Sequence, residues 1–156
     1  MSQELSLEAL IRQEEELVLP SFDAEAAFNL GMLIVERAKK DGVVIAVSVS
    51  IARQIVFQYA FIGNGPDADN WIRRKSNVVY DHQRSSLAVY TKWAAANSTV
   101  ERYGRTSADY AVLGGSFPIR VKGAGFVGAV TITGLDHLVD HAYAVDALKE
   151  YLAKHC

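Results

Sequence analysis

A lysine interrupts the apolar face of a predicted helix over residues 71–82. Positions 71, 75, 78, 79 and 82 share one face at helical spacing, and that face is apolar except for Lys75 and His82. One interpretation is that the stem of Lys75 packs while its ammonium group reaches water. The other is that the ammonium lines a cleft and neutralises a carboxylate, a propionate or a phosphate, helped by Arg73 or Arg74. Desolvation in a cleft would also lower its pKa and give it acid–base character.

A second group of polar residues opens the predicted last helix, at Asp136, His137, Asp140 and His141. The two histidines are four residues apart, as are the two aspartates, so each pair shares a helix face. Paired imidazoles can hold zinc or iron, but a metal needs further donors, and none stands at a fixed spacing. Acidic residues also stabilise the start of a helix, and His141 falls on the apolar row of this one. We therefore predict no metal site, with His137 and His141 as a weak alternative.

Several catalytic motifs are absent or occur in the wrong context. Residues 123–128 spell the dinucleotide pattern G-x-G-x-x-G, but the residues that follow read as a strand, which predicts a hairpin turn instead. The sequence contains neither a phosphate-binding P-loop motif, nor H-E-x-x-H, nor G-x-S-x-G. No catalytic residue is therefore assigned from a motif.

Composition and charge narrow the function classes. The chain has 156 residues, with 16 Lys and Arg against 18 Asp and Glu, which argues against a basic nucleic-acid-binding protein. Its charge-free runs, among them 42–52 and 123–135, are all shorter than the ~20 residues that span a membrane. The single cysteine, Cys156, has no partner for an internal disulfide. We expect a cytoplasmic protein with neither a nucleic-acid nor a membrane partner.

The charges are unevenly distributed along the chain. Residues 1–36 hold eight acids and one base, whereas residues 71–105 hold seven bases and two acids. Either the two segments face each other as complementary surfaces, or the basic segment surrounds an anionic ligand.

Apolar periodicity predicts a single α+β domain over residues 1–156, with a mainly antiparallel sheet flanked by N-terminal, middle and C-terminal helices. Two adjacent strand patterns leave no room for a crossover, so they must pair antiparallel. In the second of them Ile55, Phe57, Tyr59 and Phe61 are expected on one face. The expected elements are helices over 5–18 and between Asp23 and Gly42, strands over 43–50 and 55–61, helical segments over 71–93, strands over 117–121 and 126–133, and a helix over 136–154.

Three segments together resemble one family. They are the helix 71–79 with Ser85-Ser86 after it, the glycine-rich stretch from Gly114-Gly115 to Leu135, and the pair Asp140-His141. Over about 22–152 the chain resembles the HbpS-like family, also called the haem-degrading-domain or GlcG-like family, in its uncharacterised cytosolic branch.

The resemblance implies a profilin-like α/β/α layered domain that forms homo-oligomers, with haem or iron bound in some members. Five residues match positions typical of the family: Lys75, Ser86, Gly114, Gly115 and Asp140. His141 matches the branch that pairs it with the acid, and no residue maps onto a haem ligand. No cofactor is therefore predicted from the residues themselves.

These observations lead to one hypothesis about the site. We expect a small anion in a pocket between helix 71–82 and the C-terminal helix, which defines a ligand-binding or assembly module. The alternatives are an enzyme acting on a small carboxylate with Lys75 or His141 as acid–base, and a haem or iron binder. The expected ligand-binding residues are Arg73, Arg74, Lys75, Ser86, Gly114, Gly115, Asp140 and His141.

Overall fold

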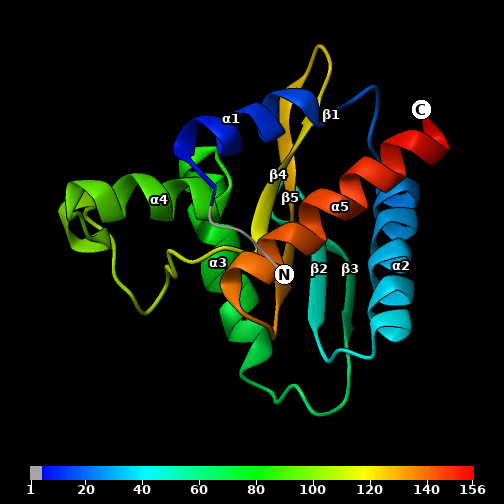
Figure 1. The fold of residues 1–156 in the computed structure, drawn as a ribbon, viewed down its shortest axis with the longest axis horizontal. Coiled ribbons are helices and arrows are strands. Elements are labelled where there is room, and N and C mark those ends of the chain that lie inside the picture. Colours follow the sequence, from blue (N-terminus) through cyan, green and yellow to red (C-terminus); the bar gives the residue numbers. More distant parts are fainter. Residues whose placement is uncertain (1–4) are drawn as a thin grey trace.

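The computed structural model describes residues 5–156 and has the α+β fold expected from the sequence (Figure 1). The helical elements in chain order are α1 (Leu7–Glu16), α2 (Ala24–Asp41), α3 (Ala68–His82), α4 (Ser86–Ala96), the short 3-10 helix η1 (Val100–Tyr103) and α5 (His137–His155). The strands are β1 (Val18–Leu19), β2 (Ala46–Ile51), β3 (Gln54–Ala60), β4 (Ser116–Val121) and β5 (Gly125–Thr133).

The five strands form one sheet in the order β1-β4-β5-β2-β3. The pairs β2–β3, β2–β5 and β4–β5 are antiparallel, and only the two-residue β1 runs parallel to its neighbour β4. The G-x-G-x-x-G segment forms the β4–β5 turn and the start of β5, as predicted. The sheet is therefore mainly antiparallel.

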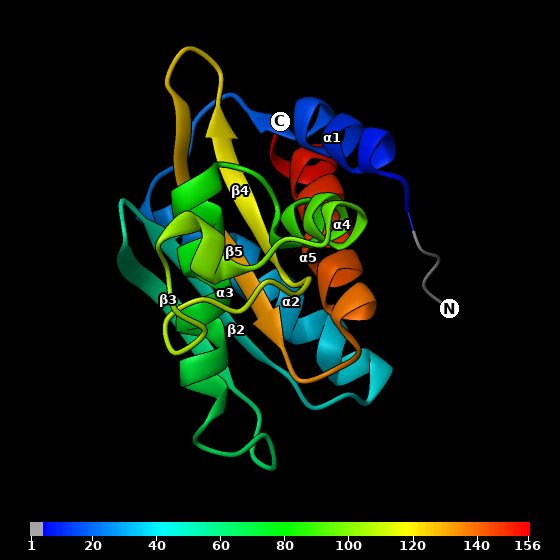
Figure 2. The same cartoon turned by 90° about the vertical axis from the view of Figure 1, so that its left-hand side faces the viewer.

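Helices cover both faces of the sheet and make three layers (Figure 2). Helices α2 and α5 pack on one face, where Val47, Val49, Val130 and Ile132 contribute to the main apolar core. Helix α3 packs on the other face, which is lined by small or polar residues. Those residues include Ala46, Ser48, Ser50, Thr131 and Thr133. The α/β/α arrangement expected from the family is confirmed, and it places α3 over a polar surface.

Helix ends follow the capping residues in the sequence. Asp23 caps α2 by accepting a 2.8 Å hydrogen bond from the backbone of Ala26, and Gly42 ends the helix in a left-handed conformation. The helical pattern over 71–93 is split, because Gln83 turns left-handed and Ser85 caps a new helix. This break separates α3 from α4.

A bulge in β3 overturns one expectation about the sheet. The register shifts between Val49 and Ser50, so Phe57 pairs with Val49 while Ile55 pairs with Ser50. Val49 and Ser50 are neighbours in β2 and therefore point to opposite faces of the sheet. Their partners on β3 do the same, so Phe57 packs toward α2 and Ile55 toward α3. The prediction that Ile55, Phe57 and Tyr59 share one face is therefore wrong at Ile55.

The acidic N-terminal helix packs on its own subunit. Glu14 of α1 is fully buried and lies 3.4 Å from Arg84 and 3.1 Å from Arg120. Its second oxygen accepts a hydrogen bond from the backbone of Ser85. Arg84 belongs to the basic segment 71–105, so here the acidic and basic segments contact each other within one chain.

Over residues 5–156, no helix combines the length and the apolar character that a bilayer span requires.

Candidate functional site

Lys75 of α3 is buried against the sheet, with 2% of its surface exposed. Its Nζ donates to the carbonyl oxygen of Ile132 at 3.2 Å, to Oγ1 of Thr133 at 3.3 Å and to Oδ2 of Asp140 at 3.1 Å. An ammonium has three protons, so each proton has an acceptor. The side chain therefore ends in an internal polar cluster and does not extend to bulk water.

Asp140, in the first turn of α5, is equally buried, with 1% exposed. Its other oxygen, Oδ1, accepts a 3.1 Å hydrogen bond from the backbone of Leu135. Burial raises the pKa of Asp140 to about 6, and the positive charge of Lys75 only partly opposes this rise. Burial likewise lowers the pKa of Lys75, against the attraction of Asp140. Both shifts favour the neutral forms of the pair.

The glycine pair before β4 makes room for this ion pair. Gly115 has a φ of +134°, and a Cβ there would lie 2.4 Å from the oxygen of Ile132 and 2.9 Å from Nζ of Lys75. At Gly114 a Cβ would lie 2.4 Å from the carbonyl oxygen of His137, and its backbone N–H donates to Nδ1 of that histidine at 2.9 Å. Both glycines are needed for close backbone approach.

A cavity of about 450 Å³ borders the Lys75–Asp140 pair, between the start of α3, the end of β5 and the start of α5. Within residues 5–156, Lys75 is the one lysine or arginine among its lining residues, and Asp67 and Asp140 are the acids. The amide nitrogen of Asn64 at its wall is shielded from solvent and lacks a hydrogen-bond partner in the described chain. The lining residues are Asn64, Asp67, Ala68, Trp71, Lys75, Leu113, Thr133, Gly134, Leu135, His137 and Asp140.

The structure does not bring Arg73 and Arg74 together with Lys75. Arg73 lies 2.9 Å from Asp109 and also donates to the carbonyl oxygen of Ala108. Arg74 donates to the carbonyl oxygen of Ser107 and stacks over the ring of Trp71. Both guanidinium groups hold the segment after η1 against α3. We expected Arg73 or Arg74 to help Lys75 neutralise an anion. The structure does not place either arginine at Lys75, because neither lines the cavity beside it.

Ser86 also lies outside the cavity. Its hydroxyl accepts from the backbone N–H of Ser116 at 3.0 Å and lies 3.3 Å from the carbonyl oxygen of the same residue. These bonds join the start of α4 to the start of β4. In this structure Ser86 has a structural contact, and no contact with Lys75 or Asp140 is found.

His141 turns away from Asp140 toward α1. Its Nε2 lies 2.8 Å from Oε1 of Gln13, and its ring packs near Phe117, with the centroids 5.8 Å apart. Nδ1 is buried without a hydrogen-bond partner in the described chain, and burial lowers the pKa of His141 to about 4. The structure does not place His141 at the cavity beside Lys75, because its imidazole packs beneath α1, so the alternative with His141 as the acid–base group finds no support in its position.

The histidines do not converge on a common point. His137 accepts from Gly114 and packs edge-on against Tyr90, whereas His141 contacts Gln13. Across residues 5–156, no three His, Cys, Asp or Glu side chains are grouped as a metal site would require. The cavity beside Lys75 has charged or hydroxyl-bearing walls at Asp67, Lys75, Thr133 and Asp140, and apolar walls at Trp71, Leu113 and Leu135. Its one imidazole within residues 5–156, that of His137, accepts a hydrogen bond from the backbone of Gly114 through Nδ1.

Sequence reasoning missed three contributors to this region. Thr133 and the carbonyl group of Ile132 complete the lysine's hydrogen bonds, and Asn64 contributes an amide from the β3–α3 connection. Thr133 could have been found, because it stands beside Gly134 at the end of a predicted strand. Backbone carbonyl groups carry no signal in the sequence.

Fold and site together define a class, a small three-layer α/β/α domain with a glycine pair packed over a buried Lys–Asp pair. Residues 22–149 match the family model described as haem degrading protein HbpS-like, and the chain belongs to this HbpS-like family.

Relatives with similar sequences carry the name UPF0303 protein. One from Rhizobium leguminosarum bv. trifolii is 45% identical over 154 residues, which cover 99% of this chain and 93% of the relative. Another, from Paraburkholderia phymatum, is 40% identical over 147 residues, which cover 94% of this chain and 89% of the relative.

Solved structures show the same fold. The Ybr137w protein superposes with a TM-score of 0.89 at 26% identity, over 97% of this chain and 91% of the other. HbpS superposes with a TM-score of 0.67 at 21% identity, over 97% of this chain and 94% of the HbpS chain. A structure described as a PduOC:Heme complex superposes with a TM-score of 0.67 at 19% identity, over 85% of this chain and 94% of the other chain.

Proposed function

We propose that this protein is a small-ligand-binding module whose ligand, a small anion such as a short carboxylate, occupies the cavity beside Lys75. The observation that carries the proposal is the buried Lys75–Asp140 pair at the wall of a cavity of about 450 Å³. Cavities of this size are typical of small-molecule sites. A buried ion pair is often no more stabilising than an apolar pair of the same volume, which favours a role beyond stability.

The charges around the cavity set a condition on anion binding. Lys75 already has three acceptors, and Asp67 adds a second negative charge to the wall. An anion therefore gains the full attraction of Lys75 only when Asp140 takes up a proton. The raised pKa of Asp140, about 6, makes that protonation accessible just below neutral pH. The amide of Asn64 offers the anion a further donor.

A second candidate function is an enzyme acting on a small carboxylate. The opposed pKa shifts of Lys75 and Asp140 favour it, because a pair displaced toward neutrality can pass a proton. In this candidate Lys75 is the acid–base group, while His141 takes no part because it lies outside the cavity. Turnover of a bound carboxylate, followed by NMR, separates the two candidates.

Thermal unfolding with acetate, succinate and inorganic phosphate tests the proposal. A ligand that binds the folded state raises the melting temperature. We expect a rise for the wild type that Lys75→Met abolishes and Arg73→Met retains, since both variants remove a cation of α3 but only Lys75 borders the cavity. Asn64→Asp, which adds a negative charge without touching Lys75, should weaken the rise if Lys75→Met fails to fold. No rise with any of these anions between pH 5 and 8 would contradict the proposal.

Further predictions accompany this function. We propose that the module works as a homo-oligomer in the cytoplasm, without a nucleic-acid or membrane partner. The unpaired, exposed Cys156 is consistent with a reducing compartment. Haem or iron binding stays a prediction from the family, and the absorption spectrum and iron content of the purified protein test it.

A further inference from the structure

Exposed apolar side chains gather along β3. Over residues 5–156, six large apolar side chains are exposed, and five of them lie on β3 or beside it. Ile55 and Tyr59 belong to the strand, with 54% and 40% exposed, and Ile62 follows it directly. Phe28 of α2 packs edge-on against Phe57 of β3, with the ring centroids 6.0 Å apart. The five are Phe28, Val44, Ile55, Tyr59 and Ile62, and we call them the β3 patch.

Strand β3 also forms an edge of the sheet (Figure 2). It pairs with β2 on one side, and no strand of the described chain pairs with the other side. Its seven residues, QIVFQYA, include neither a charged residue nor a proline. Proteins usually protect such an edge with charges, prolines or a covering element, because its free N–H and C=O groups can pair with another strand. The composition of β3 therefore favours pairing.

We infer that β3 pairs antiparallel with β3 of a second copy of this chain across a two-fold axis, which joins the two five-stranded sheets into one. A two-fold interface uses the same patch twice, so an edge strand suits it without a second matching surface. The β3 patch extends to both faces of the sheet, with Phe28 on the α2 side and Ile55 on the α3 side. Apolar residues therefore flank the paired strands above and below.

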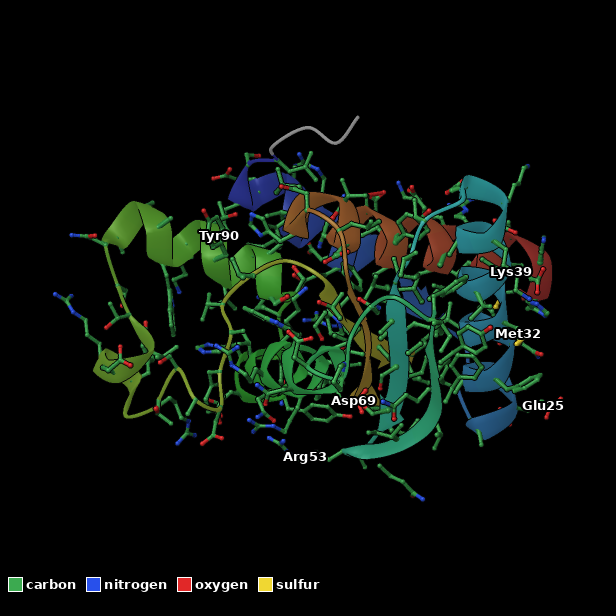
Figure 3. The ribbon with its side chains drawn as sticks, turned by 90° about the horizontal axis from the view of Figure 1, so that it is seen from below. Glu25, Met32, Lys39, Arg53, Asp69 and Tyr90 are labelled. Atoms are coloured by element: carbon green, nitrogen blue, oxygen red, sulfur yellow. The ribbon has the colours of Figure 1, made fainter. Side chains whose placement is uncertain are left out.

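The charged residues at the two ends of β3 support a second copy of this chain as the partner of the strand. Arg53 stands at the β2–β3 turn just before β3, whereas Asp69 follows the strand in the first turn of α3 (Figure 3). Asp67, the N-cap residue of α3, adds a second acid there. Antiparallel pairing brings the start of one β3 beside the end of the other. Each Arg53 then faces the acidic end of the partner strand, while parallel pairing would bring like charges together.

The interface would also support the cavity. Ile62 of the β3 patch and Asn64 of the cavity wall belong to the same β3–α3 connection. Burial of Ile62 against a partner would fix this connection and with it one wall of the cavity. The inference does not depend on which ligand the cavity takes.

Sedimentation and amide hydrogen exchange of the full chain test the inference. We expect the wild type to be a dimer or a larger assembly at about 100 µM, with slow exchange of the β3 amides. Ile55→Lys with Tyr59→Lys should reduce the mass at least twofold and speed β3 exchange, because each copy then places a lysine on both faces of the joined sheet, where like charges from the two copies repel. Tyr103→Lys is the matched control, since Tyr103 is the sixth exposed side chain, 50% exposed, and lies on η1.

If the double variant does not fold, Phe28→Lys provides a second test, because Phe28 lies on α2 and not on the strand itself. This variant should raise the dissociation constant of the assembly at least tenfold. Three results would overturn the inference: a monomeric wild type at about 100 µM, an unchanged mass in folded β3-patch variants, or fast β3 exchange in an assembled wild type.

Discussion

Nζ of Lys75 lies 3.1 Å from Oδ2 of Asp140, and both side chains are almost completely withdrawn from solvent. The two residues come from α3 and α5, on opposite faces of the sheet, and meet at the end of β5. Carbonyl and hydroxyl oxygens of β5 complete the lysine's hydrogen bonds. The pair therefore joins all three layers beside the cavity.

The pKa of Asp140 predicts one component of the pH dependence of stability. It rises from 3.8 to about 6 on folding, so between these values the folded state holds more protons than the unfolded state. Its contribution to the free energy of unfolding therefore falls as pH increases from about 4 to 7, by roughly 3 kcal/mol at most. Asp140→Asn should remove this component, and urea unfolding at several pH values measures it. An unchanged slope in the variant would contradict the assignment.

His141 predicts a component of opposite sign. Its pKa falls from 6.5 to about 4 on folding, so the unfolded state binds the proton more readily between these values. Its contribution to stability is present above pH 6.5 and is lost as pH decreases toward 4, by roughly 3 kcal/mol. We expect His141→Gln to flatten this loss in acid-unfolding curves. In a separate variant that keeps His141, Gln13→Glu places a carboxylate beside Nε2 and should raise the pKa of His141, which NMR measures. A His141 pKa above 6 in the wild type would refute this.

Gly115→Ala should destabilise the fold by about 3 kcal/mol, because the new Cβ meets the backbone at Ile132 and the ammonium of Lys75. Gly104→Ala is the matched control. Gly104 also has a positive φ, of +72°, but nothing lies within 4 Å of a Cβ there, so only about 1 kcal/mol of backbone strain is expected. Denaturant midpoints of the two variants measure the difference. Equal losses would mean that Gly115 is not required for close packing.

Glu14→Gln should loosen α1 from the body of the protein. The buried carboxylate pairs with Arg84 and Arg120, which are partly exposed. We therefore expect the free energy of unfolding to fall by about 2 kcal/mol, less than the full cost of breaking a completely buried ion pair. Glu15→Gln, at an exposed position of the same helix, should change stability little. Limited proteolysis near α1 and the denaturant midpoint report the effect. Resistance equal to that of the wild type would contradict it.

Local signals in the sequence predicted much of the fold. Asp23 and Gly42 fixed the ends of α2 because capping depends on neighbouring residues alone. The position of Lys75 on an apolar helix face left two interpretations open, and only its burial, with 2% of its surface exposed, shows that the ammonium does not reach bulk water. The bulge in β3 was not predictable, since alternation at Ile55 looks the same with or without an extra residue.

Contacts between distant segments explain what the sequence could not predict about the site. Arg73 and Arg74 look like neighbours of Lys75, but their directions depend on the segment over 105–110, which offers them carbonyl and carboxylate groups. His141 contacts Gln13 across 128 positions in the sequence, and only the docking of α1 reveals this partner. Charge and spacing along α3 and along α5 therefore singled out Lys75 and Asp140, but they could not predict which distant residues lie beside them.

The most direct test of the proposed site is an NMR titration of selectively labelled protein with acetate and inorganic phosphate at pH 5.5 and 7.5. The ¹⁵Nζ signal of Lys75 and the ¹³Cγ signal of Asp140 report on the ammonium and carboxylate groups, whose Nζ and Oδ2 atoms lie 3.1 Å apart. We predict saturable shifts of both signals that are larger at pH 5.5, and their absence in Asn64→Asp at the same anion concentration. Anion-induced shifts confined to surface arginines such as Arg73 and Arg105, with Lys75 and Asp140 unmoved at both pH values, would contradict the account.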